Sequence, residues 1–219
     1  IYNQTAAKNI GGVNNYEKLY YEYTSTNNRF KKRGIAKKIK DNYPNNYEGY
    51  ILEGLTHYWW SINTEKAQEN FKEAIKLDPD NIIACLNYVD YRYNGASKAF
   101  VLRSDNDFYK KFDKDASELI EKFPNNITVL SRMGLIYRNS ITEDDDSRFD
   151  KSKDIYEKAI EIAKKNNSSR KFNLTLDLAD LYIMSGKYDE GLEILNNAVN
   201  ISEGTQKIVS NFTLFNSYI

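Results

Sequence analysis

The sequence predicts an all-α protein built as an α-solenoid, that is, a row of helical hairpins stacked one after another. Apolar or small residues recur three, four and seven positions apart along most of the chain, which is the spacing of one face of an α-helix. Three segments of the form Pro-[Asn/Asp]-Asn interrupt this pattern, at Pro44, Pro79 and Pro124. Proline lacks an amide donor and biases the preceding residue away from helical geometry, so each segment predicts a helix end.

The stretch from Glu48 to Asn81 shows the hairpin pattern most fully, in 34 residues. Its first helix carries an apolar or small stripe at Ile51, Gly54, Leu55 and Tyr58, and its second at Ala67, Phe71, Ala74 and Ile75. One pair of helices cannot bury both stripes, so neighbouring hairpins must stack on it. The Ala67-x3-Phe71 spacing, with Pro79 eight residues later, resembles the second helix of a tetratricopeptide repeat. The resemblance implies a right-handed solenoid whose concave face binds peptides or other ligands.

The same stripes divide the chain into five units, over about residues 13–46, 47–81, 82–126, 127–169 and 170–203. Residues 1–12 read as a loose lead-in, and the first helix is expected to begin near Asn14 or Asn15, both suitable caps. In the fifth unit, Gly186 occupies a short turn that requires positive φ. Residues 204–219 predict an apolar helix that caps the last hairpin, because repeat arrays must cover their terminal apolar face.

The third and fourth units carry insertions between their two helices, at residues 94–106 and 139–150. The distance from Pro79 to Pro124 is 45 residues instead of 34, an excess of 11. Whether the insertions cover the concave face stays open at this stage. Because each one joins the two helices of a pair, we expect both on the same edge of the solenoid.

Composition excludes several function classes. Lys+Arg and Asp+Glu both number 31, so the net charge is zero and nothing in it favours nucleic acid. A hydrophobic fraction of 41% with a mean hydropathy of −0.70 describes a soluble chain with enough apolar mass for a core. No apolar run approaches the roughly 20 residues of a membrane span. The chain begins with Ile1 rather than Met, so a bacterial exported or lipoprotein-anchored protein would fit, and the compartment stays open.

The sequence predicts no catalytic residues, no metal site and no cofactor, and therefore no enzyme. His57 is the only histidine and Cys85 the only cysteine, so neither a Cys/His dyad nor a multi-cysteine metal site can form. Both fall on helices, where packing is the expected role. The acidic run at residues 143–146 lacks the glycine and the closing Glu of an EF-hand, so we interpret it as a solvated insertion.

A basic helix is predicted in the first unit. Arg29, Arg33, Lys37 and Lys40 fall on one stripe, while Ala36 and Ile39 face the core. Contact with anionic lipid headgroups or with an acidic partner is one interpretation. The neutral net charge favours the other, a solvated outer face.

The family resemblance also implies where a partner would bind, namely the second, fifth, ninth and twelfth positions of each first helix. Carried onto this chain, it yields the candidate groove residues Glu17, Tyr21, Leu52, Thr56, Trp59, Trp60, Asp90, Tyr93, Ser131, Arg138, Leu176 and Asp180. Aromatic members would act as anchors, since they bury much area at low entropic cost. Trp60 is equally expected in the core. The family's carboxylate clamp needs Lys and Asn where Glu17 and Tyr21 stand, so this mode of binding is not expected.

These observations favour a non-catalytic interaction or scaffold module that binds a peptide segment or partner protein in its concave groove. One alternative is an exported accessory protein that holds a small apolar ligand, which a closed apolar pocket would support. The other is a spacer or dimerisation module, in which the apolar C-terminal helix would form a homodimer.

Overall fold

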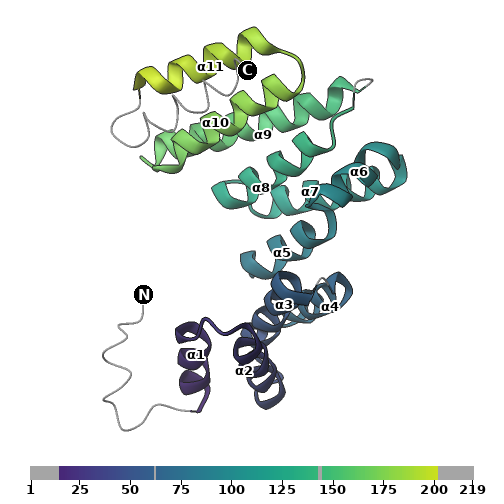
Figure 1. Ribbon diagram of the computed structural model, residues 1–219, viewed down its shortest axis with the longest axis vertical. Helices are drawn as coiled ribbons and strands as arrows, with labels where there is room; N and C mark the ends of the chain where they lie inside the picture. The colour runs from purple at the N-terminus through teal and green to yellow at the C-terminus, as the bar shows by residue number, and fades with distance from the viewer. Residues whose placement is uncertain (1–14, 62, 143–144, 202–219) are drawn as a thin grey trace. The chain divides into compact units, whose positions relative to one another are not determined.

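The computed structural model describes residues 15–61, 63–142 and 145–201, which form eleven α-helices and no strand (Figure 1). The chain divides into two compact units, each larger than one repeat unit of the sequence analysis. We call them unit 1 (Ile1–Arg92) and unit 2 (Tyr93–Ile219). The helices are α1 (Asn15–Ser25), α2 (Arg29–Asn42), α3 (Tyr47–Ser61), α4 (Thr64–Leu77), α5 (Ile82–Tyr93), α6 (Ala96–Ser104), α7 (Asn106–Lys122), α8 (Ile127–Asn139), α9 (Asp146–Lys165), α10 (Arg170–Met184) and α11 (Tyr188–Ile201). The predicted all-α fold of consecutive hairpins is confirmed, whereas the predicted lead-in and C-terminal helix lie outside the described residues.

The three proline segments work by one local mechanism. Each proline follows a helix end, and the Asn two positions later caps the next helix with its side-chain oxygen. Asn46 Oδ1 accepts from the amide of Glu48 at 2.8 Å, and Asn81 Oδ1 accepts from that of Ala84 at 3.0 Å. Asn126 Oδ1 accepts from Thr128 and Val129 at 3.0 and 3.1 Å. The capping side chains satisfy amides that the first helical turn leaves unpaired.

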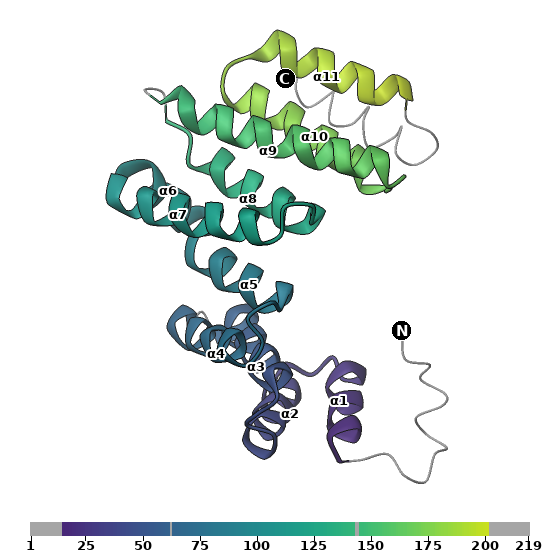
Figure 2. The same ribbon diagram turned by 180° about the vertical axis from the view of Figure 1, so that it is seen from behind.

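Unit 1 contains α1 to α5, in which α1 packs on α2, α2 on α3, and α3 on α4 (Figure 2). The buried residues Ile35, Ala36 and Ile39 of α2 contact Leu52 of α3. Phe71 of α4 is fully buried, and its ring stacks on Tyr91 of α5 with 5.1 Å between the ring centroids. The predicted stripes of α2 and α4 are therefore the faces that form the core.

Unit 2 contains α6 to α11, and both views show α9, α10 and α11 side by side (Figures 1 and 2). Its core joins α8, α9 and α10 through buried apolar residues such as Leu130, Tyr156 and Leu178. The ring of Tyr156 lies against Gly134, where an added Cβ would stand 3.1 Å from ring carbons. Gly186 has the predicted positive φ, at 75°, in the turn before α11.

Both insertions contain helical residues that the sequence does not predict. The first forms helix α6, which the periodicity does not predict, and α9 begins at Asp146, inside the expected second loop. Arg148 is buried and donates from Nη1 to the carbonyl oxygens of Leu102 in α6, at 3.0 Å, and of Ser140, at 2.8 Å. The insertions therefore lie side by side, which confirms the expectation that they share one edge.

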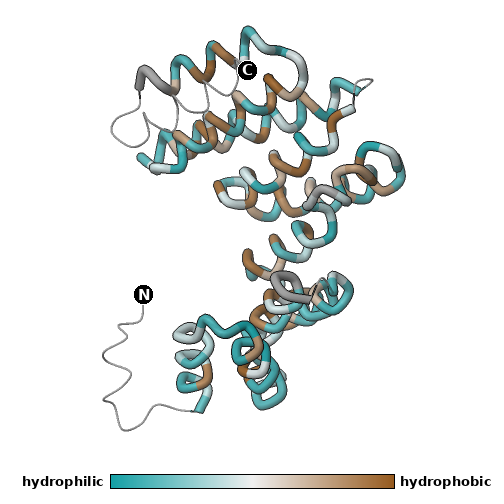
Figure 3. Tube along the Cα trace, in the orientation of Figure 1, coloured by the Kyte–Doolittle hydropathy of each residue, from teal (hydrophilic) through white to brown (hydrophobic). Residues whose placement is uncertain are grey.

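Apolar residues are spread along the helices instead of forming one long run, as the colouring of Figure 3 shows. Within the described residues, no helix is long and apolar enough to cross a membrane.

Candidate partner-binding surface on α8 and α10

Two helices of unit 2 bring four of the predicted groove residues together. Ser131 and Arg138 lie on α8, Leu176 and Asp180 lie on α10, and the two helices contact one another. Arg138 Nη1 stands 3.6 Å from Asp180 Oδ2. These four side chains and Asp177 are each partly exposed, and we refer to the five as the α8–α10 face.

Arg138 is held in an unusual environment. Its side chain is only 13% exposed, and its Nε and Nη1 atoms are buried without a hydrogen-bond partner. The hydroxyl of Tyr156, on α9, is also buried without a hydrogen-bond partner, and burial raises the pKa of this tyrosine. A buried polar group left unpaired costs about 1–3 kcal/mol. Most buried polar groups in native proteins are paired, so we treat this cluster as a candidate functional site.

Burial also disfavours the charged forms of the two carboxylates beside Arg138, those of Asp177 and Asp180. Burial raises the pKa of Asp177 above its ordinary value of 3.8, and the positive charge of Arg138 only partly offsets this. The same two causes act in the same order on the pKa of Asp180. The folded state therefore disfavours the charged form of both groups. Perturbed ionisable groups gathered on one face are typical of functional sites.

Several predicted groove residues instead have side chains buried in the fold. Leu52 and Thr56 are buried in unit 1, where the Thr56 hydroxyl donates to the Glu53 carbonyl oxygen at 2.8 Å. Asp90 is buried as well. Tyr93, an expected anchor, is 1% exposed, and its hydroxyl donates to Asp115 Oδ2 at 2.7 Å.

The remaining predicted groove residues lie on the first and third helices. Glu17 is exposed and Tyr21 is half-buried on α1. Trp59 and Trp60 belong to α3, but their side chains lie outside the described part of the structure. A partner-binding role for these four stays a prediction.

Sequence reasoning missed Asp177 and Tyr156. Asp177 precedes Asp180 by three positions, so the two share a face of α10, and this spacing was the available signal. Tyr156 packs in the core beside Ala159 and Ile160 of α9, and nothing in the sequence marks its hydroxyl as unpaired.

The other candidates for chemistry have packing roles. His57 is buried, with Nε2 standing 3.6 Å from Glu53 Oε1. Cys85 is buried, and its Sγ donates to the Pro79 carbonyl oxygen at 3.3 Å. In the acidic insertion, Asp145 caps α9 by accepting from the Ser147 amide at 3.1 Å. Among the described residues, no group of three metal-ligating side chains is gathered.

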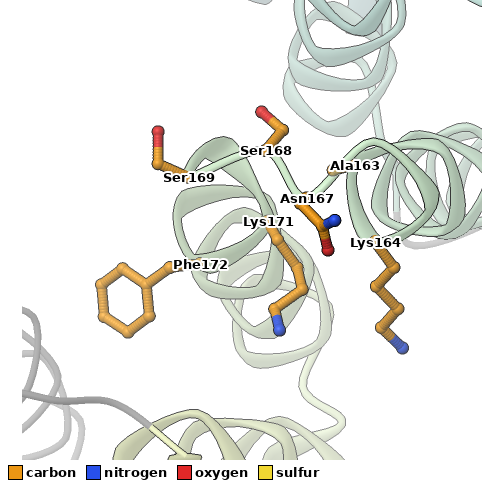
Figure 4. A pocket seen from close by; sticks show the side chains of 7 residues that line it. All are labelled: Ala163, Lys164, Asn167, Ser168, Ser169, Lys171 and Phe172. Carbon is orange, nitrogen blue, oxygen red and sulfur yellow. The ribbon is translucent and has the colours of Figure 1, made fainter.

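A hollow of about 320 Å³ lies at the turn between α9 and α10. Figure 4 shows Lys164 and Lys171 reaching in the same direction, while Phe172 points away from them. The hollow opens to solvent beside the start of α10, and a helix N-terminus with two lysines does not by itself define a site.

Comparison with known proteins agrees with this fold. Residues 63–81 match the tetratricopeptide repeat family. The structure is similar to residues 41 to the end of MamA from Desulfovibrio magneticus RS-1, with a TM-score of 0.61 at 12% identity, covering 85% of this chain and 92% of that one. It is also similar to MamA AMB-1, with a TM-score of 0.57 at 14% identity, covering 84% and 96%.

A third similar structure is yeast Tom70, with a TM-score of 0.50 at 17% identity, covering 92% of this chain and 46% of that one. A search of curated proteins finds no significant sequence match. At these identities the structural likeness establishes the fold alone. Residues 63–81 thus match one tetratricopeptide repeat, and the consecutive helical hairpins of the chain share the fold of tetratricopeptide-repeat structures.

Proposed function

We propose that this chain is a non-catalytic interaction module that binds a peptide segment of a partner protein on the α8–α10 face. Tetratricopeptide repeats mediate protein–protein interactions, which sets the class of partner. The observation that carries the proposal is the cluster of Arg138, Asp177 and Asp180, which the fold keeps partly buried and incompletely paired.

The chemistry of the face indicates what such a segment would contain. Asp180 has a side chain that is 47% exposed, so a partner can reach its carboxylate directly. A cationic side chain placed there would favour the charged form of Asp180, which burial disfavours. Leu176, partly exposed one turn before Asp180 on α10, would contact an apolar neighbour of that cation. We therefore infer that the segment pairs a Lys or Arg with an apolar residue.

A random peptide library displayed on phage tests this proposal. Selection on the wild type should enrich peptides that combine a basic and an apolar residue. Asp180→Asn and Leu176→Ala should each weaken binding of a selected peptide by roughly tenfold, as expected for residues at the centre of an interface. Glu161→Gln removes one charge from an exposed position of α9 and serves as the matched control. The proposal fails if no peptide is enriched, or if all three variants bind as the wild type does.

The alternative of a small apolar ligand has less support. The two hollows described for this chain, at the α9–α10 turn and between α2 and α4, are open and carry charged side chains in their walls. The dimerisation alternative involved residues 204–219, which lie outside the described residues.

A further inference from the structure

A cleft of about 490 Å³ in unit 1 has no part in the function proposed above. It lies between α2, α3 and α4, and we call it the α2–α4 cleft. Phe30 and Arg33 line it from α2, Glu53 and His57 from α3, and Lys66 and Glu69 from α4. Its volume falls in the range of ordinary ligand sites, about 300–1,000 Å³.

The carboxylate at the floor of the cleft is already engaged. Glu53 is buried, with Oε2 in an ion pair with Lys40 Nζ, although Oε2 accepts no hydrogen bond, and with Oε1 standing 3.6 Å from His57 Nε2. Lys37, also in the lining, pairs with Asp41 at 2.5 Å on the exposed side of α2. The charges of Lys37, Lys40 and Glu53 are therefore already paired with charges of opposite sign within the fold.

Arg33 and Lys66 differ from these cations. Within the described residues, neither has a carboxylate at ion-pair distance, and both are exposed on opposite walls of the cleft. The pKa of His57 is lowered chiefly by burial, and the charges of both Arg33 and Lys66 lower it further. Two cations from different helices therefore act on the same buried imidazole.

We propose that the α2–α4 cleft binds an acidic segment of a partner protein, whose carboxylates pair with Arg33 and Lys66. Charge complementarity carries the proposal, because a carboxylate between the two cations would have a partner on each wall. Phe30 is 73% exposed at the edge of the cleft and would contact an apolar side chain of that segment.

The geometry favours a peptide over a membrane surface. A flat lipid surface would contact the outer residues of α2, such as Lys31 and Lys38, which are exposed and do not line the cleft. Lys66 stands on the opposite wall, on α4, where a narrow chain can reach both cations at once. Glu69 is the one lining carboxylate without an ion pair within the described residues, so it should oppose binding.

Fluorescence anisotropy with a labelled hexaglutamate peptide tests the proposal, and hexaglutamine provides the uncharged probe. The wild type should bind hexaglutamate in a manner that weakens with added salt. The double variant Arg33→Gln, Lys66→Gln should lose about tenfold in affinity, since each removes a charge-assisted contact. Glu69→Gln should bind more tightly than the wild type. Lys31→Gln removes one charge from the same helix outside the cleft and should change affinity less than Arg33→Gln alone.

Three results would overturn the proposal. The first is no binding of hexaglutamate by the wild type, and the second is an equal loss of binding in the Lys31→Gln and Arg33→Gln variants. The third is binding only to phosphatidylserine vesicles, with Lys31 as important as Arg33, which would identify a membrane-facing surface. All substituted side chains are exposed, and circular dichroism would verify that the variants fold. The α8–α10 face is built from other residues, so either proposal can fail without the other.

Discussion

Individual charged side chains on the α8–α10 face reduce the stability of the folded protein, because they are partly buried. Asp177 and Asp180 would be easier to bury if they were neutral, and Arg138 lacks hydrogen-bond partners at two buried nitrogens. Neutral side chains in place of the two carboxylates, and a hydrophobic one in place of Arg138, would avoid these costs. Residues that reduce stability and cluster on one face are typical of binding and catalytic sites.

Asp177→Asn should stabilise the folded protein at pH 7. The pKa of Asp177 is raised above 3.8 in the folded state, so the wild type carries a charged group that folding disfavours. As pH falls through the raised pKa, the folded state binds a proton before the unfolded state does, and wild-type stability rises relative to the variant. The advantage of Asp177→Asn should therefore disappear below pH 3.8. Urea unfolding at pH 7 and below pH 3.8 measures this difference.

Asp154→Asn, at an exposed position of α9, is the control for the loss of one charge and should show no comparable gain. If Asp177→Asn instead unfolded more easily than the wild type at pH 7, the prediction would be contradicted. The attraction between Asp177 and Arg138 would then outweigh the cost of burying the carboxylate.

Residue positions on the candidate face were only partly predictable. Arg138 and Asp180 followed from the family resemblance, which implies partner contacts at the twelfth position of one first helix and the ninth of another. The same rule selected Leu52, Thr56 and Tyr93, which the structure buries. A shift of one residue turns a helical side chain by about 100°, so periodicity alone cannot separate the edge of a groove from the core beside it.

At the level of helices, the boundaries were more predictable than the insertions. Proline ends a helix and asparagine caps the next one, so three boundaries are encoded within three residues each. Helix α6 lacks such signals: it spans nine residues, and its N-cap residue Gly95 offers no side chain to the first turn. Its place depends on tertiary contacts, in particular on Arg148 from another insertion.

Arg148→Met should destabilise the protein by about 2–4 kcal/mol, because it would leave two buried carbonyl oxygens without their donor. Those oxygens belong to Leu102 and Ser140. The variant would also lose a cation–π contact, since the Arg148 guanidinium lies 3.8 Å from the centre of the Tyr109 ring. Urea unfolding would measure the change in free energy.

Arg148→Lys separates charge from geometry at this position. Lysine keeps the charge, but its single nitrogen cannot replace both Nη1, which donates to the two carbonyl oxygens, and Nε, which donates to Asp145 Oδ2 at 2.9 Å. An intermediate loss of stability is therefore expected. If Arg148→Met unfolded at the same urea concentration as the wild type, α6 and the α8–α9 connection would be held by other contacts.

For the whole molecule, the neutral net charge conceals strong local differences. Lys+Arg and Asp+Glu both number 31, and this equality favours the interpretation that the basic face of α2 only contacts solvent. The structure places Arg33 of that helix opposite Lys66 of another, across one cleft. The net charge cannot reveal that two cations face each other across a cleft, because this depends on which helices pack together. The repeat pattern predicted the fold, whereas the two candidate sites required the contacts between helices.

The two proposed sites should act independently. They share no residue and belong to different compact units, and substitutions without common partners usually have additive effects. Asp180→Asn should weaken the selected basic peptide and leave hexaglutamate binding unchanged, while Arg33→Gln with Lys66→Gln should do the opposite. Combining all three substitutions and measuring both affinities would check this. A loss of both activities in either variant would point to a general effect on folding.

The most direct test of the partner-binding surface is an NMR titration of the isotope-labelled wild-type protein with a peptide selected from the library. Amide signals on α8 and α10 should shift most, including those of Ser131, Arg138, Leu176 and Asp180, and Asp180→Asn should need roughly ten times more peptide for the same shifts. Shifts confined to helices other than α8 and α10, or the same dependence on peptide concentration in Asp180→Asn as in the wild type, would contradict the assignment of the partner site to the α8–α10 face.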